Sequence, residues 1–156
     1  MLLLKESELV APTISEIEVG LKNNEIGIVG EDFHFNAEIL AGYLIDSVKV
    51  NFVQRDDVTY SHDWSLDISW DRYKGEKKDN IHQHFDIPAD AAKGRYDYII
   101  TVTDQNGTSL EEVRTVYLID EEERQSVLSG VEAEETTQCN CHQAFEDRLI
   151  QANYQK

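Results

Sequence analysis

The sequence has few cysteines and prolines and no long apolar run. Its two cysteines, Cys139 and Cys141, lie near the C-terminus, so no disulfide framework holds the preceding residues together and their stability must come from a hydrophobic core. No stretch approaches the roughly 18 consecutive apolar residues that a transmembrane helix needs, so we expect no transmembrane segment. The opening residues 1–5 are too short, and too soon interrupted by Lys5, to form a complete signal peptide.

Basic residues are also scarce. The chain has 14 lysines and arginines against 31 aspartates and glutamates, which gives a formal net charge of −17 at pH 7. A surface of this sign repels the phosphates of nucleic acids and of anionic lipids. We therefore exclude nucleic-acid binding, while the acidic surface remains compatible with solubility alone or with cationic and basic partners.

Familiar enzyme motifs are missing as well. The sequence contains no Gly-rich phosphate loop, no Gly-x-Ser-x-Gly nucleophile elbow and no His-Glu-x-x-His zinc motif. With 31 carboxylates in the chain, some pair by chance, so paired acids say nothing about glycoside cleavage. We expect the protein not to be an enzyme.

The sequence does contain a series of short segments in which apolar and polar residues alternate. In the clearest one, Phe33, Phe35, Ala37 and Ile39 share one face, which is the two-residue period of a half-buried strand. Segments with this period are predicted as strands at residues 13–19, 33–39, 45–53, 58–70, 81–87, 95–103 and 110–119. Turn signals separate them, among them the Asn106-Gly107 pair of a hairpin turn.

Seven evenly spaced strands without a convincing helix are typical of an all-β fold. We predict a seven-stranded, immunoglobulin-like antiparallel sandwich over residues 12–119, with a barrel as the weaker alternative. Residues 120–156 carry acidic runs and too few apolar side chains for a core, so we predict an acidic C-terminal tail, partly helical or disordered. Phe145, Leu149 and Ile150 stand at helical spacing and favour a short helix near its end.

Two histidines stand two residues apart on one predicted strand. His82 and His84 therefore leave the same face about 7 Å apart, a separation at which two imidazoles can reach one zinc or copper ion. His62 is the third ligand that we predict, with His34 as an alternative, and Asp86 continues the face as a ligand or outer partner. The other interpretation is that these histidines line a solvated sheet face.

A second group of soft ligands lies in the tail, in the run Cys139-Asn140-Cys141-His142. Two cysteines this close are strained as a mutual disulfide, so they pair with other chains, bind a metal or stay free. The run supplies three ligands where a structural zinc site needs four. Incidental thiols in a tail are the simpler interpretation.

Aromatic residues gather on the stretch 58–70 and just after it. The rings of Tyr60, Trp64, Trp70 and Tyr73 are able to form a platform for a sugar. Because the two tryptophans fall in phase with apolar neighbours, they are more simply core residues.

The stretch from His82 to Gly107 carries the most specific motifs of the chain. It holds His82-Gln83-His84, an Ile87-Pro88 stop, Gly94-Arg95-Tyr96 and the hairpin Asp104-Gln105-Asn106-Gly107, and Trp64 to Trp70 lie upstream. These motifs resemble the bacterial family named domain of unknown function 4625, and the likeness spans residues 12–119. Members often carry a histidine-rich turn before the Trp strand, whereas residues 56–64 here hold only His62, which argues against a shared metal site.

The resemblance implies an exported domain, often in lipoproteins of the cell envelope, with no assigned activity. We therefore expect a non-catalytic, envelope-exposed binding module whose partner is a protein or a glycan at the cell surface. The alternatives are a zinc- or copper-binding protein that uses His82, His84 and His62, and a carbohydrate-binding module.

Overall fold

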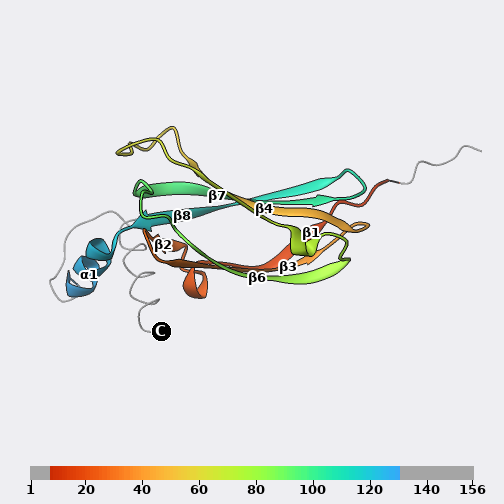
Figure 1. The fold of residues 1–156 in the computed structure, drawn as a ribbon, viewed down its shortest axis with the longest axis horizontal. Coiled ribbons are helices and arrows are strands. Elements are labelled where there is room, and N and C mark those ends of the chain that lie inside the picture. The colour runs from red at the N-terminus through yellow and green to blue at the C-terminus, as the bar shows by residue number, and fades with distance from the viewer. Residues whose placement is uncertain (1–7, 131–156) are drawn as a thin grey trace, which may run out of the picture.

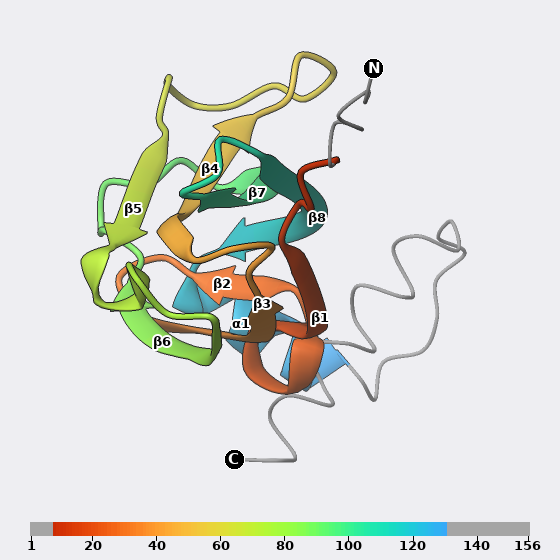
Figure 2. The ribbon, with the colours of Figure 1, turned by 90° about the vertical axis from the view of Figure 1, so that its right-hand side faces the viewer.

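The described part of the chain is a sandwich of two β-sheets (Figures 1 and 2). The computed structural model describes the backbone of residues 8–130 and the side chains of residues 8–126. The smaller sheet is antiparallel, in the order β1 (Thr13–Val19), β3 (Asp32–Leu40), β6 (Lys78–Asp86). The larger sheet has the order β2 (Ile26–Ile28), β8 (Ser109–Ile119), β7 (Gly94–Asp104), β4 (Ile45–Gln54), β5 (Leu66–Trp70). The helical elements are η1 (Leu21–Asn23), η2 (Asp71–Tyr73) and α1 (Glu121–Gly130).

The core lies between the sheets and follows from the alternation in the sequence. On β3, the side chains of Phe33, Phe35, Ala37 and Ile39 are at most 1% exposed, while the residues between them face outward. The facing sheet contributes a matching set of buried side chains: Val48, Val50, Phe52, Tyr96, Tyr98, Ile100 and Val102. The rings of this core pack edge to face, for example Phe52 on Tyr98 at 5.0 Å between ring centroids. This packing fixes which face of each strand points to solvent.

The structure confirms the predicted β-sandwich and corrects its details. The described residues form eight strands, because β2 adds a strand that the sequence did not reveal, and β2 pairs with β8 in parallel. The predicted strand 58–70 is a strand only over Leu66–Trp70, and the residues before it form a loop. Asn106-Gly107 does form the turn between β7 and β8, with Gly107 at a φ of +93°.

The start of the predicted tail is helical, since α1 begins directly after β8. Asp120 caps this helix by accepting a hydrogen bond from the Glu123 amide at 2.7 Å. Residues 131–156, with the expected helix near Phe145 and the run Cys139-Asn140-Cys141-His142, lie outside the described residues. No helix among residues 8–130 is long and apolar enough to cross a membrane.

Candidate metal centre

The pairing of β3 with β6 brings histidines together on the outer face of the smaller sheet. The two strands are antiparallel, with His34 directly opposite His84 and Asn36 directly opposite His82. Because Phe33 and its in-phase neighbours point into the core, the alternate residues of β3 must point outward. One register therefore places three imidazoles from positions up to 50 residues apart on one surface.

The three histidines form a compact group that we name the histidine cluster: His34, His82 and His84. Each offers one ring nitrogen such that the three atoms lie within 4.8 Å of one another. Nδ1 of His34 and Nε2 of His84 lie 3.3 Å apart. A tetrahedral zinc ion with Zn–N bonds of about 2.0–2.1 Å separates neighbouring ligand nitrogens by about 3.3–3.4 Å. The two rings thus already stand at the spacing of a zinc site.

An oxygen acceptor lies beside one nitrogen of each ring. Glu18 Oε1 lies 3.2 Å from His34 Nε2, and Asp32 Oδ2 lies 2.7 Å from His84 Nδ1. Asn36 Oδ1 lies 3.3 Å from Nδ1 of the third ring, His82. Ionised carboxylates only accept hydrogen bonds, so a neutral ring at His34 or His84 would carry its proton on the outer nitrogen. Acceptors placed behind the ring are the usual support of metal-binding histidines.

Glu18 reaches the cluster because of an irregularity in β1. The register of β1 on β3 shifts between Ser15 and Glu18, where Glu16 has a φ of +52°. A bulge of this kind re-aims the residues that follow it, and here Glu18 comes to pair with Asn36, on the outer face. Sequence reasoning missed the roles of Glu18, Asp32 and Asn36. Asp32 and Asn36 could have been found, because they alternate in phase with His34 and so lie on the same face of β3. The irregular alternation of β1 gave no such indication for Glu18.

The cluster is open to solvent on one side. His82 and His84 are exposed, whereas the side chain of His34 is only 14% exposed and sits deeper between its neighbours. A partly buried ring anchors the group and two exposed rings flank it. The site therefore lies on the surface of the sheet and not inside a cavity.

His62, predicted as the third ligand, lies elsewhere. It belongs to the loop between β4 and β5, where its Nε2 is 2.8 Å from the carbonyl oxygen of Asp90 and its Nδ1 is 2.9 Å from Ser61 Oγ. Both ring nitrogens are thus engaged in tying this loop to the segment before β7. The structure groups His82 and His84 with His34, the alternative of the sequence prediction. Asp86 lies opposite Asp32 at the end of β6.

The predicted aromatic platform is part of the packing. Trp70 stacks on Phe35 at 6.1 Å between ring centroids, and Trp64 packs edge-on against Tyr96 at 5.6 Å. Both tryptophans are half-buried against the core. This arrangement favours the interpretation of these rings as core residues.

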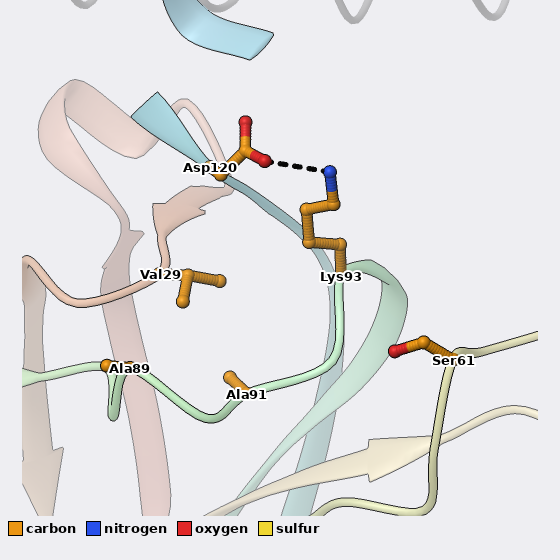
Figure 3. A pocket seen from close by; sticks show the side chains of 6 residues that line it. All are labelled: Val29, Ser61, Ala89, Ala91, Lys93 and Asp120. Carbon is orange, nitrogen blue, oxygen red and sulfur yellow. Dashed lines mark hydrogen bonds and ion pairs between the residues drawn. The ribbon is translucent and has the colours of Figure 1, made fainter. Parts of the chain in front are cut away.

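A shallow hollow of about 450 Å³ lies beside the segment before β7 and the end of β8 (Figure 3). Its described lining comprises Val29, Ser61, Ala89, Ala91, Lys93 and Asp120, so it holds no residue of the histidine cluster. Lys93 Nζ lies 2.8 Å from Asp120 and 3.1 Å from Glu123. The hydrogen bonds that Lys93 donates to these carboxylates raise its pKa, and the two acids neutralise its positive charge within the fold. The hollow therefore presents no free cation to a ligand.

Comparison with known proteins bears on the family of the chain. No curated protein matches. A similar solved structure is that of Spo0M, a sporulation control protein from Bacillus subtilis, with a TM-score of 0.46 and 15% identity. The match covers 80% of this chain but only 56% of that one, so this chain spans just over half of its length. The family profile named domain of unknown function, DUF4625, matches residues 5–119, and the chain belongs to that family.

Proposed function

We propose that this domain is a non-catalytic binding module whose ligand is a divalent transition-metal ion, zinc or copper, held by His34, His82 and His84. The observation that carries the proposal is the contact between His34 Nδ1 and His84 Nε2 at 3.3 Å. If both rings are neutral and donate their outer N–H groups to Glu18 and Asp32, the two inner nitrogens face each other with lone pairs and no proton between them. Such a contact is stable only when a cation, either a proton or a metal ion, lies between the nitrogens.

The chemistry of the donors and the charge around them favour a metal ion. Imidazole nitrogen is a preferred ligand of zinc and copper, and three such donors lie within reach of one ion. Glu18 and Asp32 contribute two carboxylates close behind the rings, and the chain as a whole carries a charge of −17. This field attracts cations.

The location of the protein and its macromolecular partner are proposed from the family resemblance. Exposure at the cell envelope, a lipoprotein context and a protein or glycan partner are parts of the proposal that rest on that resemblance alone. Carbohydrate binding is the less favoured candidate, because one face of Trp70 lies against Phe35.

Metal titration of the purified chain tests the proposal. We expect one zinc or copper ion per chain by calorimetry, and a higher melting temperature in its presence, because binding at 100 times Kd stabilises a folded state by about 2.7 kcal/mol. His34→Ala and His84→Ala should abolish both effects, while His62→Ala should leave them unchanged. Absence of binding by the wild type would mean that a proton bridges the two rings and that the proposal is wrong.

A further inference from the structure

Three donor atoms leave a four-coordinate metal ion one ligand short. A zinc ion in proteins is almost always bound by four ligands in a tetrahedron, and a site with three protein ligands keeps its fourth position for an external one. Among the described residues, the histidine cluster is the one group of three or more potential ligands that lies close enough to hold an ion. The identity of the fourth ligand is therefore a question that the geometry raises directly.

The nearest carboxylates cannot supply it while they orient the rings. Glu18 and Asp32 contact the ring nitrogens that point away from the cluster. A carboxylate bonded to the far nitrogen of an imidazole stands roughly 6–7 Å from an ion on the near nitrogen, about three times a zinc–oxygen bond. Coordination by either group would cost its hydrogen bond to the ring.

The fourth position faces outward, beside a free strand edge. His82 and His84 are exposed on the outer face of the smaller sheet, and β6 is its edge strand, bonded to β3 on one side only among the described elements. An extended polypeptide is able to approach such an edge closely. A donor from a partner chain thus has access to the ion.

Local charge selects the kind of donor. Glu18, Asp32 and Asp86 surround the cluster with negative charge, in a chain of net charge −17. These charges repel anionic donors such as carboxylates and thiolates but leave a neutral imidazole unaffected. We infer, on the basis of the metal binding proposed above, that the fourth ligand is the imidazole of a histidine on a partner polypeptide, which docks on this face through the ion.

Cobalt(II) in place of zinc makes the fourth position visible by absorbance. The full chain is loaded with less than one equivalent of cobalt and titrated with imidazole, with acetate, and with a neutral peptide that holds one histidine, beside its alanine counterpart. We expect imidazole and the histidine peptide to change the spectrum in a saturable way, and the alanine peptide to leave it unchanged. His34→Ala/His84→Ala is the control for cobalt outside the cluster.

A second variant tests whether negative charge around the cluster disfavours anionic ligands. Asp86→Asn removes one negative charge from this face without removing a ring contact, so it should strengthen acetate binding by up to about twofold and leave imidazole binding unchanged. A cobalt site that ignores imidazole, or a ratio of acetate to imidazole affinity that Asp86→Asn does not move, overturns the inference while metal binding stands. Failure to bind cobalt, zinc or copper at all overturns the proposed function and the inference with it.

Discussion

The substitution Asp32→Asn tests whether the carboxylates behind the rings prepare the site for metal. The change keeps the size of the side chain but removes the charge that now lies 2.7 Å from His84 Nδ1. An amide in its place accepts a weaker hydrogen bond, so the proton of His84 is no longer held on the outer nitrogen. Part of the population then carries it on Nε2, where the metal should bind.

The size of the effect follows from distance and exposure. An ion on Nε2 of His84 would lie roughly 6–7 Å from the Asp32 carboxylate, and a charge of −1 attracts a charge of +2 at that distance by about 1.3 kcal/mol in water. The water value applies because Asp32 and His84 are 57% and 48% exposed. This charge effect alone corresponds to about a tenfold loss of affinity, and the lost orientation of the ring should add to it within the 10- to 100-fold range known for such partners.

Competition with a chromogenic zinc indicator, at fixed pH and ionic strength, measures the change. Asp86→Asn is the matched control, because Asp86 is the cross-strand neighbour of Asp32 and carries the same charge. We expect about a threefold or smaller loss for the control. Equal losses in both variants would show that charge alone matters, and the orienting role would then be refuted. Nitrogen-detected NMR of the metal-free protein should place the His84 proton on Nδ1.

Four substitutions test the stability of the sandwich. In a urea titration, Tyr98→Phe should stabilise the fold by about 1 kcal/mol, because the Tyr98 hydroxyl is buried without a hydrogen-bond partner. Tyr96→Phe should destabilise the fold by about 1 kcal/mol in the same measurement, because the Tyr96 hydroxyl donates to the Ala92 carbonyl at 2.6 Å. Burial opposes ionisation of Asp104, but several backbone amides outweigh it and hold its pKa below the usual range. Its contribution to stability is therefore complete above the unfolded pKa of about 4 and is lost as the pH falls through the lower folded pKa, so Asp104→Asn should flatten the acid limb of a melting-temperature profile. Trp70→Ala should cost about 3 kcal/mol by thermal or chemical unfolding if the ring is a core residue, and a cost below about 0.5 kcal/mol would revive the sugar platform.

The alternation of the sequence predicted most of the sandwich because burial on one face dictates it. It failed where aromatic residues alternate without forming a strand. Tyr60 lies in a loop, where its hydroxyl accepts from the Arg55 amide at 3.0 Å and donates to the Arg95 carbonyl. Its neighbour Trp64 packs on Tyr96. The loop therefore buries aromatic rings at the same two-residue spacing that a strand would show.

The short strand β2 was beyond sequence reasoning for a different reason. Its three residues, Ile26–Ile28, include Gly27, and its pairing with β8 is parallel and distant in sequence. Gly27 has a structural cause, because a Cβ there would lie 2.7 Å from Leu118 and 3.1 Å from Phe33. Close packing thus required the residue that made the strand hard to recognise.

The candidate site was half predictable. His82 and His84 follow from strand period alone, but the third ring depends on the register of β3 against β6, which the sequence does not state. A slip of β6 by one residue would turn His84 toward the core and the partly buried Phe85 outward. The register is instead fixed by the inward faces of the two strands, where Phe33, Phe35 and Ile81 are at most 1% exposed. His62 was the natural choice because it lies on the aromatic-rich stretch that we predicted as a strand, but this part of the stretch is a loop and His62 is not in the cluster.

Packing of the inner face of the smaller sheet therefore fixes which side chains meet on its outer face. Glu18 comes from β1, His34 from β3, and His82 with His84 from β6, so an ion at the cluster would link all three strands of the sheet. Because β6 is an edge strand that pairs with β3 alone among the described strands, the ion should stabilise β6 more than the other strands. Metal binding should then slow hydrogen exchange of the amides that β6 donates to β3 more than that of the amides between β7 and β8. Uniform protection of both sheets would place the ion's effect on global unfolding, and no protection of β6 would place the ion somewhere other than the histidine cluster.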